Sequence, residues 1–536
     1  IGGTGGISTL LDPAVVQIDN GKKTIVDSAD LSFKASVEYL SNDTLMNYGT
    51  IDIGPDIRGH SDSSVWINAA GSHLEVGGRF FESQGTLDAS AHNNTVVYSG
   101  RATQVIKDAG VYGYYDLMLA GNGDKTLDQD VLIRGDITLL SGNFSPTNRQ
   151  ITVRGNWSNQ GGTFQEAGSR VIFDGSDGQT ISSNLEETFH NLQLRSSGPV
   201  LLKGNVAVKD TLVLQTNHVI TGSHMLTLGT TDSSGTLIHE EGTILGRFER
   251  WITDTVTPYG PLLFPVGTTD HYRPARVGLD SISSGGSLIG EFIPRDPGRS
   301  GLPLYDDPDS LFNTFVEGYW ELTHEHGLQT GAMHLELTGN GFASFPVHQA
   351  AGILSQVDVQ QEWQTSGIHL EASDHTARRK NISILSGQYS LADTSDCQVP
   401  ETPTVYGPTD TCTNAGGVLY HIEPGTTDSI AWQVMGGTFT PDANNHDTIY
   451  VDWGLTAQKG SVSAAGHNEC SRSATHTVTV NLHSMAPKAI NGPVEVARNQ
   501  TGAVYSVDSL PGYSYRWTVT GGTITKGNGN ASISVD

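Results

Sequence analysis

The sequence has few cysteines and few basic residues. Its 536 residues contain three cysteines, Cys397, Cys412 and Cys470, and none precedes position 397. This placement does not fit a metal site built from closely spaced cysteine pairs. The 30 Lys and Arg residues stand against 57 Asp and Glu residues, which gives a net charge of −27. This charge argues against nucleic acid or an anionic membrane as a partner.

Long apolar segments are also missing. No run of 18 apolar residues occurs, so no membrane-spanning helix is expected. The first six residues, IGGTGG, lack the basic start and apolar stretch of a signal peptide, so an exported protein would have its leader removed or outside this sequence. The 64 glycines and the many Ser, Thr, Asn and Asp residues are instead typical of a turn-rich all-β protein. The length predicts several domains.

The most informative feature that is present is a segment that occurs twice. Residues 96–153 and 171–228 align without a gap, 75 residues apart, so that Gln104 falls on Gln179 and Leu139 on Leu214. Apolar positions stay apolar, whereas the polar residues between them change. Packing rather than chemistry therefore constrains the repeat. The pattern extends backwards, because residues 74–80 resemble residues 151–157 at a spacing of 77.

Within each copy, short strand patterns of period two recur about every 20 residues and end at Gly, Asn, Asp or Ser. A short strand, a turn and a return to the same position after about 20 residues describe one coil of a parallel β-solenoid. The 75-residue repeat then holds about four coils, and the solenoid covers residues 1–243. Leu139 and Leu214 are expected to be core residues. An array of β-sandwiches is the alternative, because short strands separated by glycine occur there too.

A second repeat, with a spacing of 85 residues, lies nearer the C-terminus. Tyr420 matches Tyr505, and the segment from Trp432 to Thr438 matches the segment from Trp517 to Thr523. The pattern predicts Ig-like sandwiches at residues 398–485 and 486–536, the second incomplete, with each Trp in the core. An exposed glycan-stacking Trp is the alternative. In the first sandwich Cys412 and Cys470 are expected to form a disulfide in an oxidising exterior, with two buried thiols as the alternative. Cys397 would remain unpaired.

The 85-residue repeat resembles the PKD-like and Ig-like modules of giant cell-surface proteins that Bacteroidota export by type IX secretion. The resemblance rests on the Gly-Pro, Tyr, Trp and Gly-Gly-Thr positions and on Trp453-Gly454. Residues 264–267, 272–275 and 318–322 resemble the sandwich domain that follows repeat regions in such proteins, which predicts a β-sandwich at residues 244–397. Since the second module stops just before the expected Trp-Gly, more of the protein, including a sorting domain, is expected to follow.

The same resemblance implies glycosylation. The tripeptide Asp-Ser/Thr-aliphatic resembles the O-glycosylation signal of Bacteroidota and is more frequent than the roughly two or three copies expected from average composition. Turn formation is the alternative explanation for part of this excess. Copies in turns, at Thr44, Thr255, Ser310 and Ser509, are the better candidates, whereas Thr211 and Thr448 run into strand patterns. The full set of hydroxyl residues is Ser28, Thr44, Thr211, Thr255, Ser281, Ser310, Ser429, Thr448 and Ser509.

Signals for catalysis or metal binding are weak, so no catalytic residue, metal site or cofactor is assigned. Repeat-equivalent positions share no acid: Asp174 replaces Ser99, and Glu186-Glu187 replaces Val111-Tyr112. His324 and His326 would lie on one side of a strand, but no third ligand has a meaningful spacing. The acidic turn at residues 305–309 could hold calcium, although acidic turns are usually only solvated.

The chain is therefore predicted to be all-β, with a parallel β-solenoid, a β-sandwich and tandem Ig-like/PKD-like modules. The expected function is a non-enzymatic, elongated scaffold segment of a secreted cell-surface adhesin or filament, with gliding adhesins as the nearest analogue. Expected partners are the type IX machinery at the outer membrane, neighbouring domains or copies, and surface glycans. One alternative is a self-assembling fibre subunit, because an open solenoid end exposes strand edges unless residues 1–20 cap it. An enzyme acting on polysaccharide is the other.

Overall fold

The computed structural model is all-β and divides into two compact units, residues 1–398 and 399–536. Among the described residues the only helix is a short 3-10 turn, η1 (Gly110–Tyr112), and none is long and apolar enough to cross a membrane. For residues 8–39, 216–217 and 259–260 only the backbone of the strands is described. The structure does not describe residues 1–7, 11–14, 19–22, 27–29, 34–35, 40–43, 60, 82–83, 254–258, 359–360, 397–399, 424–427, 444, 455–458, 469–471, 484–488 and 510–514.

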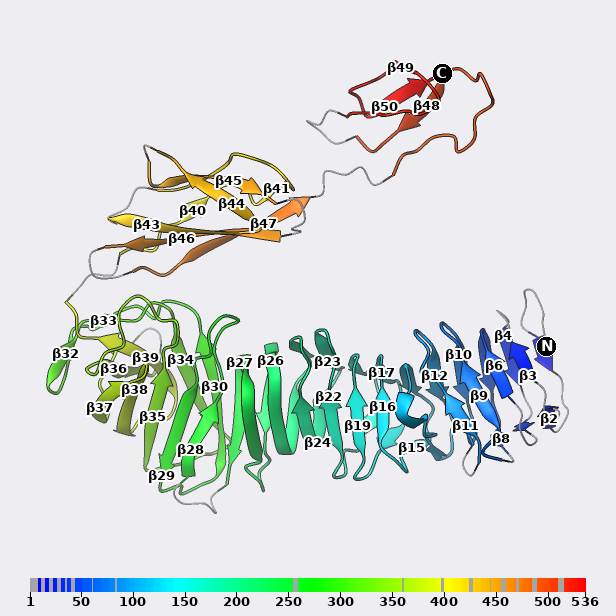
Figure 1. The fold of residues 1–536 in the computed structure, drawn as a ribbon. Helices are drawn as coiled ribbons and strands as arrows, with labels where there is room; N and C mark the ends of the chain where they lie inside the picture. Colours follow the sequence, from blue (N-terminus) through cyan, green and yellow to red (C-terminus); the bar gives the residue numbers. More distant parts are fainter. Residues whose placement is uncertain are drawn as a thin grey trace. The chain divides into compact units, whose positions relative to one another are not determined.

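The first part of the first unit is a parallel β-solenoid whose coils stack in a row (Figure 1). On its first face Val96 pairs with Leu117, Leu117 with Ile137, and Ile137 with Trp157. These steps of 21, 20 and 20 residues confirm the predicted coil length. The strands of this face are β1 (Ser8–Leu10), β4 (Asp30–Phe33), β7 (Thr50–Ile53), β10 (His73–Val76), β12 (Thr95–Tyr98), β14 (Asp116–Leu119), β17 (Ile137–Leu139), β20 (Trp157–Asn159), β23 (Gln179–Ser183) and β25 (Val200–Lys203).

Two further faces complete each coil. The second face follows the first along the chain and contains β2 (Val15–Ile18), β5 (Ser36–Tyr39), β8 (Ile57–Gly59), β13 (Gln104–Val105), β15 (Asp124–Thr126), β18 (Asn143–Ser145) and β21 (Thr163–Phe164). The third face contains β3 (Lys23–Val26), β6 (Thr44–Asn47), β9 (Val65–Asn68), β11 (Thr86–Asp88), β16 (Val131–Ile133), β19 (Gln150–Val153), β22 (Arg170–Phe173) and the second half of β24 (Glu187–Leu194). We call the turn from the first to the second face the first corner, and the turn from the third back to the first the third corner.

The 75-residue repeat is out of phase with the coils. Val96 lies on the first face, and three coils later that ladder reaches Trp157. The repeat equivalent of Val96 is Val171, which lies on the third face of the same coil and pairs with Ile151 and Leu192. The repeat therefore spans three coils and two of the next three faces, rather than about four whole coils. Leu139 and Leu214 are each 1 % exposed, which confirms both as core residues although they lie on different faces.

The solenoid ends on two long strands, β26 (Val206–Leu228) and β27 (Thr236–Ile252). They pair in parallel with each other, and the residues Phe248–Ile252 of β27 pair on the other side with β30 (Gly286–Ile293) in antiparallel orientation. The boundary expected between residues 243 and 244 thus falls inside β27. Backbone hydrogen bonds run from the last coil directly into the following domain, so this edge of the last coil is occupied.

That domain is a β-sandwich. Its two sheets meet where the ring of Phe248 lies 5.9 Å from that of Phe264, and Gly290 is needed because a Cβ there would lie 2.6 Å from the Phe264 ring. Besides β30, one sheet contains β34 (Tyr319–Glu325), β39 (Gly387–Asp393), β36 (Gly352–Gln356) and β33 (Asn313–Thr314). The other contains β28 (Tyr259–Phe264), β29 (Ala275–Asp280), β35 (Ala332–Thr338), β38 (Thr376–Ile382) and β37 (Ile368–Ser373), and a separate hairpin is formed by β31 (Leu304–Asp306) and β32 (Asp309–Leu311).

The second unit begins with a complete small sandwich. Its core contains Tyr420 and Trp453, whereas Trp432 is partly buried and packs against this core from its edge. The expectation that Trp432 is the central core residue is therefore wrong, because its strand β43 (Ser429–Met435) lies at the edge of its sheet. One sheet contains β40 (Val405–Tyr406), β42 (Val418–Ile422), β45 (Thr448–Trp453) and β44 (Gly437–Pro441), and the other β41 (Asp410–Cys412), β47 (His476–His483), β46 (Lys459–His467) and β43 (Ser429–Met435).

The following module contains β48 (Ala503–Ser506), β50 (Ser532–Val535) and β49 (Ile524–Lys526). It reproduces contacts of the first module at repeat-equivalent positions, which confirms the 85-residue repeat at the level of hydrogen bonds. In both modules the indole N–H donates to a loop carbonyl, and a turn glycine with positive φ donates its N–H to an aspartate. These contacts are Trp432 to His446 and Trp517 to Asn530, and Gly417 to Asp452 and Gly502 to Asp536.

Candidate functional site: a row of arginines at the third corner

A row of charged side chains follows the third corner of the solenoid. The residue directly after the third-face strand is Arg134, Arg154, Asp174 and Arg195 in four successive coils. The backbone N–H of each donates to a carbonyl of the preceding coil, at 2.8 to 3.0 Å. Adjacent members are therefore held about 5 Å apart along the solenoid axis, which is the spacing of paired strands.

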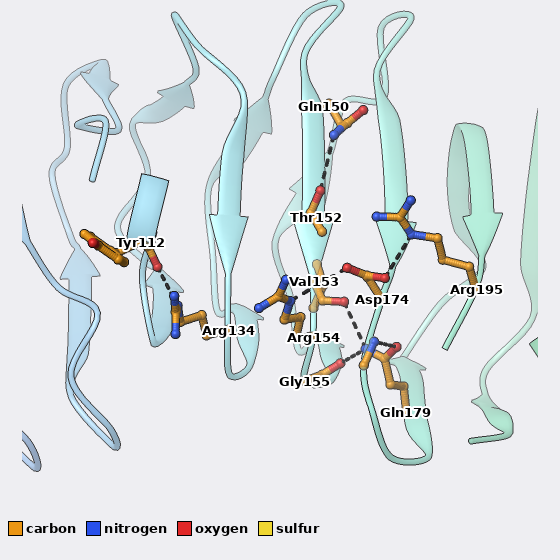
Figure 2. A network of polar contacts seen from close by, with 11 residues as sticks. Tyr112, Arg134, Gln150, Thr152, Val153, Arg154, Gly155, Asp174, Gln179 and Arg195 are labelled. Carbon is orange, nitrogen blue, oxygen red and sulfur yellow. Dashed lines mark hydrogen bonds and ion pairs between the residues drawn. The ribbon is translucent and has the colours of Figure 1, made fainter. Parts of the chain in front are cut away.

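Asp174 lies between two arginines (Figure 2). Its carboxylate accepts a hydrogen bond from Nε of Arg195 at 2.9 Å and lies 3.7 Å from Nε of Arg154. The side chains of Arg154 and Arg195 are 46 % and 43 % exposed, so the pairing holds them in place without burying them. At the other end of the row, Nε of Arg134 donates to the Tyr112 carbonyl at 2.6 Å, and its guanidinium lies 6.0 Å from the Tyr112 ring centroid.

The buried amide of Gln179 fixes the backbone beneath this row. Its Nε2 donates to the carbonyls of Val153 (3.1 Å) and Gly155, which flank Arg154 in the chain. Its Oε1 accepts from the N–H of Gly175 at 2.9 Å, directly after Asp174. The amide therefore joins the turn that carries Arg154 to the turn that carries Asp174 in the next coil. A buried side chain with all these partners satisfied resists rearrangement.

A second row of polar side chains lies two residues further along each coil. Its carboxylates accept hydrogen bonds from backbone N–H groups of the next coil. Oδ1 of Asp116 accepts the N–H of Asp136 at 2.8 Å, and Oδ1 of Asp136 accepts the N–H of Asn156 at 2.7 Å. Burial raises the pKa of Asp116, against the lowering effect of the hydrogen bond from Asp136. These side chains bridge successive coils rather than pairing with the arginines.

The arginine row borders a groove of about 640 Å³. Three arginines and two aspartates, Asp174 and Asp177, contribute charge, and serine hydroxyls contribute hydrogen-bonding groups. At one end the rings of His92 and Tyr115 lie 4.8 Å apart. This volume falls in the range of small-ligand sites. With its donors, acceptors and aromatic faces, the groove can bind an anionic, hydroxyl-bearing ligand.

A second cavity, of about 360 Å³, contains Glu187 and Glu166. Burial raises the pKa of Glu187, whose carboxyl accepts a hydrogen bond from Asn159 at 2.9 Å. Burial opposes ionisation of Glu166 as well, but an ion pair with Lys209 lowers the pKa of this carboxyl overall. Glu187 lines this cavity but is only 2 % exposed, and its carboxyl is already hydrogen-bonded within the fold.

The predicted glycosylation residues are dispersed over the chain. Ser28 and Thr255 lie outside the described residues. Thr44 opens β6 and pairs with Lys23 and Val65, so its expected place in a turn is wrong. Thr211 and Thr448 lie in β26 and β45, as expected, and Ser310 is a half-buried residue of β32. The exposed candidates are Ser281, Ser429 and Ser509.

Only one cysteine of the predicted disulfide lies among the described residues. Cys412 is partly buried at the end of β41, and both Cys470 and Cys397 lie outside the described residues. The pairing of Cys412 with Cys470 stays a prediction. Peptide mapping without reduction should recover the two cysteines in one linked pair of peptides.

The two histidines considered as possible metal ligands, His324 and His326, contact different partners. His324 contacts Ser386, whereas His326 follows the end of β34 with φ 54° and stacks on Trp251 at 4.6 Å. They do not share one side of the strand, because the chain turns after Glu325. In the acidic turn, Asp306 is buried against the Arg379 guanidinium. Over the part of the chain that the structure describes, no group of three or more His, Cys, Asp or Glu residues could hold a metal ion.

The sequence reasoning did not find the arginine row. The signal was available as basic residues at 134, 154 and 195 with Asp174 between them, at intervals of 20, 20 and 21 residues. This interval is the coil length and not the 75-residue repeat. Only after residues are assigned to faces do these four fall on one corner.

Comparison with known proteins identifies the C-terminal unit. A family model described as a PKD-like domain matches residues 399–480 and 483–536. No match was found among curated proteins or among solved structures. The two matched segments coincide with the two copies of the 85-residue repeat, and PKD-like domains are typical of extracellular proteins. Residues 399–536 therefore form PKD-like β-sandwich domains, joined in sequence to an all-β unit that contains a parallel β-solenoid.

Proposed function

We propose that this chain is a non-enzymatic segment of a secreted cell-surface adhesin or filament protein, in which it serves as a structural and binding scaffold. The proposal includes export by the type IX secretion system of a Bacteroidota cell, and decoration by O-linked glycans. It rests on the fold together with the resemblance of the PKD-like modules and the middle domain to such surface proteins.

The pairing of β27 is the observation that carries the scaffold role. This strand pairs with the last solenoid strand on one side and with β30 of the sandwich on the other. A pull along the solenoid is therefore transmitted through backbone hydrogen bonds instead of through a flexible linker. The serial PKD-like modules extend the chain by further independent sandwiches, as expected for a spacer.

Four carboxylates of the solenoid are already engaged within the fold, which supports a non-enzymatic role. Asp174 is held by two arginines, Asp116 and Asp136 bind backbone N–H groups, and Glu187 is buried against Asn159. A pair of carboxyl groups that acts on a glycosidic bond must instead face a substrate from both sides.

Surface labelling of intact cells tests the proposal. An antibody raised against residues 1–398 should label unpermeabilised cells of the source organism, and externally added protease should remove the label. In a strain without a functional type IX translocon the antigen should remain inside the cell. Label that appears only after lysis would contradict a surface location.

Glycosylation is tested on the same native material. Peptide mapping should find added mass on exposed hydroxyls of the Asp-Ser/Thr-aliphatic set, with Ser281, Ser429 and Ser509 ahead of Thr211 and Thr448, because the three serines are exposed whereas the two threonines are half-buried. The recombinant chain made in the bacterial cytoplasm is the control. If the peptides from surface-exposed protein carry no added mass, turn formation is the explanation for the excess of the tripeptide.

A further inference from the structure

We propose that the third-corner groove binds an acidic polysaccharide, with Arg134, Arg154 and Arg195 contacting its carboxylate or sulfate groups. This site goes beyond the scaffold role, which needs only the continuity of the strands. The proposal rests on where the charged residues recur, on their spacing, and on the mixture of groups beside them.

The arginine row does not follow from the repeat or from the corner geometry. Only Arg134 has a basic repeat equivalent, Lys209, whereas the equivalents of Arg154 and Arg195 are Gly77 and Ala120, which carry no charge. The first corner has the same backbone stacking from coil to coil, but the residues directly after its strands are uncharged: Ser99, Ala120, Leu140 and Gln160. Three arginines at one corner of a chain with net charge −27 therefore need another explanation than packing.

The spacing of the row fits a polymer. Successive coils place their side chains about 5 Å apart, so Arg134 and Arg154 are about 5 Å and Arg154 and Arg195 about 10 Å apart along the axis. An extended chain of pyranose rings advances by a similar distance per ring. Each arginine can then meet an anionic group on a successive or alternate sugar, and a guanidinium binds carboxylate or sulfate through two parallel N–H groups.

The other groups of the groove favour a sugar over other polyanions. Asp174 and Asp177 can accept hydrogen bonds from hydroxyls, and Ser176 and Ser197 can both donate and accept. An acidic polypeptide has few hydroxyls to offer these carboxylates.

Aromatic faces at one end add a surface for the apolar face of a sugar ring. Tyr115 packs against the exposed ring of His92 in the groove, and Tyr112, outside the groove lining, is 63 % exposed beside Arg134. Tyrosine combines an apolar ring with a polar tip, which suits an interface with a hydroxylated ligand. The row is also preorganised, because Asp174 and the Gln179 amide hold two of the arginines before any ligand arrives.

Binding of defined polymers to the full chain tests this site. The probes are polygalacturonate for carboxylate, heparin for sulfate, dextran as a neutral glycan, and poly-L-glutamate as an acidic polypeptide, each measured at low and high salt. Binding to at least one of the two acidic glycans is expected, with affinity falling as salt screens the charges. Dextran should not bind. The polymer that binds distinguishes carboxylate from sulfate.

Arg154→Gln and Arg195→Gln should each lower the affinity about tenfold or more, because each removes charge-assisted hydrogen bonds. Arg101→Gln is the matched control, since Arg101 is an exposed solenoid arginine that does not border this groove. All three variants should melt at the wild-type temperature.

Three results would overturn the site: equal affinity for Arg154→Gln and Arg101→Gln, binding of poly-L-glutamate as tight as that of the glycans, or no binding of either acidic glycan. None of these results bears on the surface location, which the labelling of intact cells measures separately.

Discussion

Gln104 and Gln179 occupy the same position in the two copies of the 75-residue repeat, and they make the same hydrogen bonds at different corners of the solenoid. Each accepts an N–H four residues upstream, from Gly100 at 2.7 Å or from Gly175 at 2.9 Å. Each donates to two carbonyls of the preceding coil, those of Val76 and Gly78 or those of Val153 and Gly155. Both glutamines are 2 % exposed.

The difference lies in what each amide holds. Gln104 secures the first corner at Gly77 and Ser99, whereas Gln179 secures the third corner at Arg154 and Asp174. In both, the upstream glycine is required, because a Cβ at Gly100 or Gly175 would lie 2.5 or 2.8 Å from the amide carbon. The glycine and the glutamine thus form a hydrogen-bonded corner motif that occurs at two different corners, and the residues beside it differ between the two. At the first corner the residue directly after each strand is uncharged, whereas the third corner carries the proposed binding row.

The largest expected effect tests whether the two copies are equally essential to the core. Leu139→Ala and Leu214→Ala should each lower the free energy of unfolding by about 2–5 kcal/mol, because each removes a buried side chain and leaves a cavity. Denaturant unfolding measures this loss. Leu140→Ala, at a partly exposed neighbouring position, is the control with a small loss. A large loss of stability for only one of the two leucines would show that the two faces do not contribute equally to the core.

Gln104→Ala and Gln179→Ala test this hydrogen-bonded corner motif. Each should cost about 1–3 kcal/mol, because buried carbonyls and one buried N–H lose their partner. Gln160→Ala, on the exposed surface, should be nearly neutral. Affinity for an acidic glycan should fall only in Gln179→Ala, since only that amide holds a turn that carries an arginine of the row. If Gln104→Ala lost as much affinity as Gln179→Ala, glycan binding would not depend specifically on the third corner.

The smallest effect concerns Glu187, whose repeat equivalent is the exposed Tyr112. Because burial raises the pKa of Glu187 above its ordinary value of 4.5, the unfolded chain ionises first as pH rises, so this residue subtracts stability above pH 4.5. Glu187→Gln should therefore be more stable than wild type at neutral pH, and the difference should vanish below pH 4.5. Thermal melts across pH measure it. Glu186→Gln, at an exposed position, should show no such trend, and a neutral-pH loss in Glu187→Gln would contradict the burial argument.

Much of the solenoid followed from the sequence because its signals are local. The coil length, the core positions of Leu139 and Leu214, and the strand position of Thr211 all follow from alternation and turn residues. The prediction for Trp432 was wrong for a physical reason. Alternation places a residue on one side of a strand, but its depth depends on which neighbours cover that side, and there Trp453 fills the core.

The sequence by itself determined the building units: a repeated coil of about 20 residues, a module that occurs twice at a spacing of 85, and an acidic, turn-rich composition. Only the tertiary structure decided how these units are phased and joined. The 75-residue repeat is not a whole number of coils, so equivalent residues rotate to different faces, and residues at intervals of 20 or 21 meet at one corner. The pairing of β27 with β30 is likewise a long-range contact. Such contacts depend on which coil lies beside which, and local residue patterns do not contain that information.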